Sequence, residues 1–255
     1  GFDNKFKDFP NHILGITQEI WEQRGLSTLH HYYSENIPVR SLGSMVMGNQ
    51  HVIAATTATL AEFPDRQLLG EDVIWSGTPE EGMLSAHRIL TTATHLGDGV
   101  YGKASGKALK YRVITGCHAK NNQIDDEWLI RDQGAVVRQL GIEPKKYAAD
   151  LITREGGPDH CVQPFTPAID VPSLYKGKGN EKEFGQKYAD TIRRIMGAEI
   201  SCIKSEYDRD CQVEYPGGVS SHSWDSVERF WMSLRASFPN AKLTIDHQID
   251  RQDSM

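Results

Sequence analysis

The sequence repeats itself at an offset of 175 residues, and this repeat limits the possible folds more than any other feature. Without a gap, Phe63-Pro64 falls on Phe238-Pro239 and Gly43 falls on Gly218. The alignment joins residues 32–74 to residues 207–249, with further identical pairs at Tyr32 and Tyr207, Val52 and Val227, Ala61 and Ala236, Leu68 and Leu243, and Ile74 and Ile249. Solenoid repeats are about 20–50 residues long, so a period of this length indicates two copies of a domain.

The first copy has helical patterns first and strand patterns afterwards. Residues 15–35 predict an amphipathic helix that breaks near Gly25, and residues 48–63 predict a second helix with Asn49 as its N-cap. Pro64 ends that helix because proline disfavours α geometry in the residue before it. Strands are then predicted over 67–77, 82–97, 107–121 and 123–141. The predicted fold class is α+β, with tandem cone-shaped domains that each pack N-terminal helices on a curved antiparallel sheet.

The repeat also predicts where the domains begin and end. The first domain is expected at 1–141 and a linker at 142–180, whose Pro and Gly content makes it a poor helix or strand and whose apolar residues suit a surface. The second domain is expected at 181–255, with its front half only, since Met255 aligns with Glu80 just before the sheet strands of the first copy. We expect either a longer chain or a partner that supplies those strands.

Composition and charge exclude several classes of function. The net charge is −6 without a long basic run, which argues against nucleic acid as a partner. No apolar stretch approaches the roughly 20 residues of a membrane span, and no signal-like segment opens the sequence, so we expect a cytoplasmic protein. The four cysteines form no C-x-x-C pair and are expected to be reduced. No metal-ligand spacing is present, and GDGVYG does not precede a helix, so no metal or other cofactor is expected.

Strand alternation sorts the candidate catalytic residues by face. We predict that His87, Asp126 and Asp132 share a pocket with Trp128, in which a carboxylate orients the imidazole for acid–base catalysis. The alternative is that His87 is a core histidine and that Asp132 caps a helix or pairs with an arginine.

Further residues are predicted to contact a substrate: Trp75, His95, Arg112, Glu127 and Trp128. The two tryptophans have the alternative role of filling the core. His95 lies at a strand end, where it either lines the mouth of the cone or belongs to an exposed loop.

The stretch NNQIDDEWLIRDQGAVVRQLG resembles the close of SnoaL-like polyketide cyclases and ester cyclases, a family of the nuclear transport factor two-like superfamily. The matching positions are Ile124, Glu127, Trp128, Asp132 and Gln139-Leu140-Gly141. HLGDGVYGKASGKALKYRV resembles the His/Gly-rich strand end, hairpin and following strand of the same family. The resemblance covers most of the first copy and reaches the second through the repeat.

The resemblance implies an enzyme of cyclase, isomerase or hydratase type that acts by acid–base chemistry on a hydrophobic carbonyl or cyclic substrate. The family's catalytic Asp falls on Leu129 and the His beside it falls on Thr115, and leucine cannot move a proton. The alternative is therefore a non-catalytic module for small-ligand binding and dimerisation. Proteins of this fold often pair through the outer face of the sheet, which implies a homodimer or a pseudo-dimer of the two copies.

Overall fold

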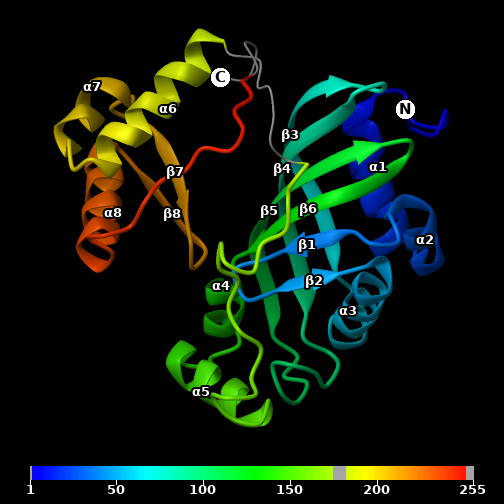
Figure 1. Ribbon diagram of the computed structural model, residues 1–255. Coiled ribbons are helices and arrows are strands. Elements are labelled where there is room, and N and C mark those ends of the chain that lie inside the picture. Colours follow the sequence, from blue (N-terminus) through cyan, green and yellow to red (C-terminus); the bar gives the residue numbers. More distant parts are fainter. Residues whose placement is uncertain (1, 175–181, 251–255) are drawn as a thin grey trace. The chain divides into compact units, whose positions relative to one another are not determined.

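The computed structural model describes residues 2–174 and 182–250. The chain divides into two compact units, residues 1–175 and 176–255, and each is described by itself (Figure 1). Within these described ranges, no helix combines the length and the apolar character needed to cross a membrane.

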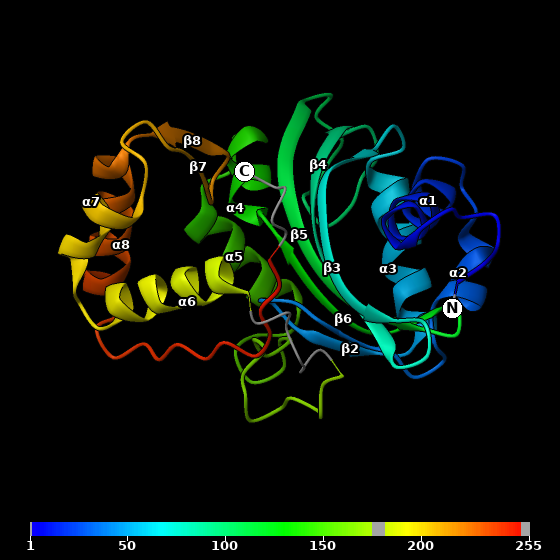
Figure 2. The same cartoon turned by 90° about the horizontal axis from the view of Figure 1, so that it is seen from above.

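Unit 1 begins with three helices that lie on the concave side of a curved sheet (Figure 2). They are α1 (Phe9–Trp21), α2 (Leu29–Tyr32), which follows a 3-10 turn at Leu26–Thr28, and α3 (Asn49–Glu62). The Asp8 side chain caps α1 by accepting a hydrogen bond from the Asn11 N–H at 2.8 Å. The buried apolar residues of α1 pack against the sheet, and they include Phe9, Ile13 and Ile16.

The sheet of unit 1 has the strand order β2-β1-β6-β5-β4-β3. Its antiparallel part comprises β3 (Gln67–Thr78), β4 (Gly82–Thr94), β5 (Ala108–Lys120) and β6 (Gln123–Arg131). The short strands β1 (Pro38–Arg40) and β2 (Met45–Met47) extend it, with β1 parallel to β6. Helices on a curved, mainly antiparallel sheet confirm the predicted α+β class, and β1 and β2 are strands that were not predicted from the sequence.

The strand register assigns each side chain to one of two faces. Across β4, β5 and β6, His87 pairs with Thr115 and Thr115 pairs with Leu129, so these three side chains share a row. Ser85, Cys117 and Glu127 form the next row on the same face. Apolar residues of this face, such as Met83 and Cys117, belong to the core that α1 covers. We call it the inner face, and the opposite side of the sheet is the outer face.

Three local predictions for unit 1 are wrong. The last predicted strand ends at Arg131, and α4 (Gln133–Gln139) follows it. The predicted linker contains α5 (Pro144–Arg154), which starts with Pro at its first position and with the Glu143 side chain as its cap. Gly48, at φ 89°, is the N-cap of α3, and the Asn49 side chain instead donates to the Tyr33 carbonyl at 3.1 Å.

Unit 2 repeats the front half of unit 1 in element order. It contains α6 (Glu183–Met196), a 3-10 turn (Ile200–Cys202), α7 (Ile203–Glu206), β7 (Gln212–Tyr215), β8 (Val219–His222) and α8 (Trp224–Ser237). The bounds of α8 are those of α3 shifted by 175, and Ser223, at φ 74°, stands where unit 1 has Gly48. That residues 181–255 form the front half of a second SnoaL-like domain stays a prediction.

Candidate functional site

The candidate site of unit 1 lies on the inner face, where ionisable side chains are buried. Glu127 is 5% exposed and sits on β6 opposite Cys117 of β5. Burial raises the pKa of the Glu127 carboxyl to about 7, although the Tyr33 phenol as hydrogen-bond partner and the Arg131 charge both lower it. A carboxyl group with this pKa is partly ionised and partly protonated near neutral pH, so it can accept and return a proton.

His87 lies on the same face, one row along and two strands away. Its side chain is 5% exposed, and its Nδ1 lies 3.4 Å from the Ser85 hydroxyl oxygen. Burial lowers the pKa of His87 to about 4, so its imidazole is neutral at neutral pH. Since β5 separates β4 from β6 and the two residues are one row apart, the backbones of His87 and Glu127 are about 12 Å apart.

Asp126 and Trp128 lie on the outer face, so the predicted pocket that joined them to His87 is wrong. Asp126 pairs with His118 in the register, and its carboxylate forms a buried ion pair with the Arg40 guanidinium. The same carboxylate accepts a hydrogen bond from the backbone N–H of Leu174 at 2.7 Å. Trp128 packs edge-on against Phe165. These contacts give both residues a structural role.

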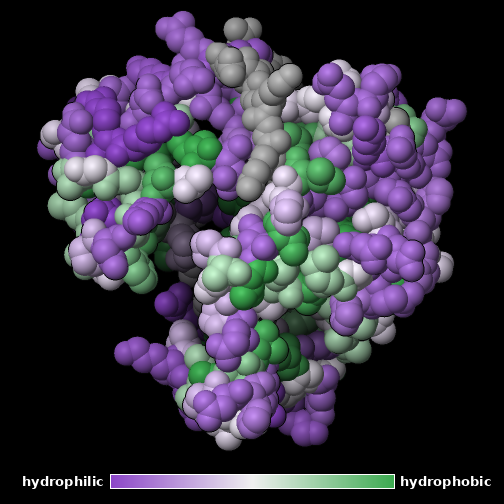
Figure 3. All heavy atoms as spheres, in the orientation of Figure 1, coloured by the Kyte–Doolittle hydropathy of each residue, from purple (hydrophilic) through white to green (hydrophobic). Residues whose placement is uncertain are grey.

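The contacts of Asp126 and Trp128 define a strap, residues 165–174, that crosses the outer face of unit 1. Arg40 binds the strap through Asp170, with Nε at 2.6 Å from Oδ1, and through the Val171 carbonyl. Figure 3 shows apolar side chains gathered over the ends of β1 and β2 and the segment that follows α5. The prediction that part of residues 142–180 lies along a surface holds for this strap.

Asp132 and Arg112 also lie away from His87. Asp132 is the N-cap of α4 and accepts a hydrogen bond from the Ala135 N–H at 2.9 Å, which is the alternative role considered for it. Arg112 forms a two-point ion pair with Glu71, with 3.0 Å for each N–O distance. Its register partner is Leu90, which places it on the outer face.

Trp75 and His95 occupy the two ends of the inner face. The Trp75 ring packs edge-on against Phe9 of α1 and remains 38% exposed. His95 is 1% exposed, and its ring nitrogens lie 3.1 Å from Glu62 and 3.0 Å from Ser105. Because Glu62 also accepts the N–H groups of Val100 and Tyr101, His95 and Glu62 together anchor the loop between β4 and β5.

Sequence reasoning missed Tyr33, Arg66 and Arg131, which surround the buried groups of the inner face. Tyr33 follows α2, and burial with the neighbouring Glu127 raises its pKa well above the usual value. Arg131 is one row from Leu129 on β6 and lies on the same face as Glu127 and His87. Alternation within β6 could have placed Arg131 on one face with Glu127 and Leu129, but it says nothing about Tyr33 or Arg66.

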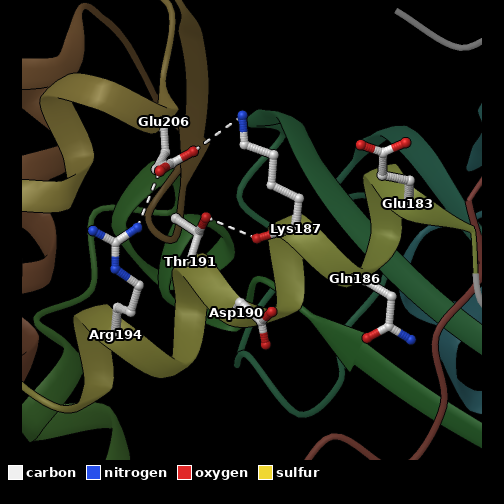
Figure 4. Close-up of a pocket in the computed structure, with 7 residues that line it drawn as sticks. All are labelled: Glu183, Gln186, Lys187, Asp190, Thr191, Arg194 and Glu206. Atoms are coloured by element: carbon white, nitrogen blue, oxygen red, sulfur yellow. Dashed lines mark hydrogen bonds and ion pairs between the residues drawn. The ribbon is translucent and has the colours of Figure 1, made fainter.

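A groove on unit 2 is lined mainly by α6 and is filled with charged side chains (Figure 4). Glu206 pairs there with Lys187 at 3.2 Å and with Arg194 at 3.0 Å. The Thr191 hydroxyl donates to the carbonyl of Lys187 at 2.9 Å. Because these groups satisfy one another, we place the candidate site in unit 1. Among the described residues, no group of three or more His, Cys, Asp or Glu could hold a metal ion.

The fold and the inner face define a class of protein: an α+β cone with buried ionisable groups on its inner face. Residues 11–140, just over half of the chain, match the family of SnoaL-like polyketide cyclases. The chain belongs to this family, as the motifs of the first copy indicated. The family consists of cyclase-type enzymes that act on small molecules.

Several solved structures are similar to the first half of the chain. IdmH from Streptomyces antibioticus is 18% identical, with a TM-score of 0.44 over 52% of this chain and 98% of IdmH. A SnoaL-like polyketide cyclase from Agrobacterium tumefaciens is 17% identical, with a TM-score of 0.42 over 52% of this chain and 97% of that one. TsrD from Streptomyces laurentii is 14% identical, with a TM-score of 0.45 over 56% and 100%. No curated protein matches the sequence.

Proposed function

We propose that unit 1 is an acid–base enzyme of the cyclase type, in which Glu127 moves the proton and neutral His87 hydrogen-bonds to the substrate. The observation that carries the proposal is the position of Glu127, a buried carboxyl on the inner face with a pKa of about 7. The substrate is a hydrophobic carbonyl or cyclic compound that contacts both residues. This assignment keeps His87 as predicted and replaces Asp126 by its neighbour.

The reaction begins with proton removal next to the substrate carbonyl. The Glu127 carboxylate takes the proton from carbon, which leaves an enolate and a neutral carboxylic acid. Attack of the enolate carbon on a second carbonyl of the same molecule closes a ring, and the acid then returns its proton to the new alkoxide. Neutral His87 carries one N–H and one unprotonated nitrogen, so it can donate to the developing oxyanion.

The position of Glu127 explains how such a reaction could proceed with leucine at the family's acid–base position. Leu129 is two residues further along β6 on the same face, one row from Glu127. Thr115, at the place assigned to the family's histidine, lies between Leu129 and His87. Compared with the family's positions, the carboxyl is therefore one row away, at Glu127 instead of residue 129. The imidazole is one strand away, at His87 on β4 instead of residue 115 on β5.

The test is the exchange of the α-protons of 2-tetralone in D2O, followed by proton NMR with the complete chain. We expect catalysed exchange whose rate rises with pH through about 7 and falls by about 100-fold or more in Glu127→Gln. Glu81→Gln is the matched control, because Glu81 is exposed in the turn between β3 and β4. Equal rates in wild type and Glu127→Gln would refute the role of Glu127.

A second candidate function is small-ligand binding without catalysis. It is favoured by Leu129 and Thr115, which carry no ionisable group at the two family positions. In that case 2-tetralone binds in equilibrium dialysis, but exchange is no faster than in buffer. That result would withdraw the enzyme assignment and retain the inner face as a ligand site.

A further inference from the structure

Arg66 is a buried cation on the inner side of unit 1, and no carboxylate of the described residues is among the groups that shift its pKa. It follows α3 and is 2% exposed. Its guanidinium carbon lies 4.2 Å from the centre of the Trp21 ring and 5.9 Å from that of Tyr111. Its Nε and Nη1 have no hydrogen-bond partner among the described residues.

Arg40, in contrast, is a buried arginine whose guanidinium has both ion-pair and hydrogen-bond partners. Arg40 is 0% exposed, and its guanidinium meets the carboxylates of Asp126 and Asp170 and a backbone carbonyl. For Arg66, burial lowers the pKa to about 10 and the Arg131 charge lowers it further, whereas Tyr111, also a hydrogen-bond partner, and Tyr101 raise it. A buried guanidinium with unpaired N–H groups is costly unless a ligand satisfies it.

Two more unpaired polar atoms belong to the same part of the inner face. Arg131 is half-buried, and its positive charge acts on Arg66 as well as on Glu127. Its Nε has no hydrogen-bond partner among the described residues. Thr91 is 0% exposed, its hydroxyl has no partner in the part of the chain that the structure describes, and it pairs in the register with Tyr111. Arg131 pairs with Val113, one row from Tyr111, so these donors lie on adjacent rows.

We infer that Arg66 and Arg131 form a carboxylate-binding subsite on the inner face, so that the ligand of unit 1 is an aromatic or polycyclic carboxylic acid bound as its anion. The planar guanidinium presents N–H groups that match two carboxylate oxygens, and Trp21 and Tyr111 offer aromatic surface beside it. The inference rests on the proposed function only in that both place the ligand on the inner face of unit 1. It adds the chemical class of the substrate.

The experiment compares two probes of equal shape by isothermal titration calorimetry at pH 7.5: 2-naphthoate, an anion, and 2-naphthamide, which is neutral. We expect the complete chain to bind 2-naphthoate about tenfold more tightly than the amide. In Arg66→Gln that preference should fall to about threefold or less, through weaker binding of the naphthoate alone. Arg112→Gln is the matched control, since Arg112 pairs with Glu71 on the outer face, and it should keep the full preference.

Arg131→Gln provides a second variant in case Arg66→Gln does not fold, which circular dichroism will show. No binding of either probe by wild type, no preference for the anion, or a full preference retained in both variants would overturn the subsite. The failure of the proposed function looks different. Glu127→Gln would then keep the same exchange rate as wild type, while the preference for 2-naphthoate and its loss in Arg66→Gln would remain.

Discussion

Asp126 and Glu127 are neighbours in the sequence, yet their carboxyl groups lie on opposite faces of β6 in entirely different surroundings. The Asp126 carboxylate forms an ion pair with Arg40 and accepts hydrogen bonds from Ser173 and Leu174 of the strap. The Glu127 carboxyl is buried against Tyr33 and Cys117, and its burial favours the neutral form. One carboxyl is thus held in a structural ion pair, and the other remains available for proton transfer.

Removal of the Asp126 carboxylate should destabilise unit 1 strongly. Asp126→Ala leaves the Arg40 guanidinium buried, with Asp170 as its remaining carboxylate partner, and we expect a loss of about 3 kcal/mol in the free energy of unfolding. Urea denaturation provides the measurement. Arg112→Ala breaks the more exposed pair with Glu71 and should cost at most about 1 kcal/mol. Similar costs in the two variants would contradict the structural role of the buried pair.

The sequence predicted the long elements of unit 1 well because periodicity within one segment is a local property. The bounds of β3 and α3 agree with prediction to within about a residue, and Pro64 follows the end of α3 as expected. The short strands were not predicted. β1 is only three residues long, and it is stabilised by parallel pairing with β6, a contact between distant parts of the chain.

The candidate site was predicted less well because alternation assigns faces within a strand but not between strands. Asp126 and Trp128 do share a face, as predicted, but that face is opposite to the one of His87. A bulge adds Asp125 to β6 opposite His118 and Ala119, so Ile124 falls on the inner face instead. Arg66 lies outside every strand, and its approach to Tyr111 depends on how α3 meets the sheet.

Asp132 allows a test of a capping role against the catalytic role predicted from the sequence. Asp132→Ala removes the acceptor for the Ala135 N–H and should lower the free energy of unfolding by about 1 kcal/mol. Asp132→Ser should restore most of that loss, because serine is also a good N-cap. Both values come from urea denaturation. A full loss of 2-tetralone exchange in Asp132→Ser, with stability unchanged, would return Asp132 to the catalytic residues.

The raised pKa of Glu127 predicts how stability depends on pH. The folded state holds the Glu127 proton up to a pKa of about 7, whereas the unfolded chain releases it near the ordinary glutamate pKa of 4.5. Its stabilising contribution is complete below pH 4.5 and is lost as the pH rises through 7. The loss amounts to about 3 kcal/mol in wild type and should be absent in Glu127→Gln.

Urea denaturation at pH 4.5 and pH 8 measures this difference for wild type and Glu127→Gln, with Glu81→Gln as the exposed control. The free energy difference between the two pH values should be the same in wild type and Glu81→Gln. If Glu127→Gln also keeps it, Glu127 titrates near its ordinary pKa, and its proposed role as the proton-transfer group would lose its basis.

His12 predicts the opposite dependence on pH. It is 0% exposed, both ring nitrogens lack a partner among the described residues, and the rings of Phe2, Phe6 and Phe9 surround it. Burial lowers its pKa from 6.5 to about 4, so the unfolded state takes up a proton first and the contribution of His12 is lost as the pH falls from 6.5 to 4.

His12→Phe keeps the aromatic packing and should raise the free energy of unfolding at pH 7 by about 1 kcal/mol. It should also lessen the loss of stability between pH 6.5 and pH 4, measured by urea denaturation, whereas His30→Phe on the exposed side of α2 should change neither. A lower stability of His12→Phe at pH 7 would show that the ring nitrogens of His12 make a favourable interaction in the folded protein.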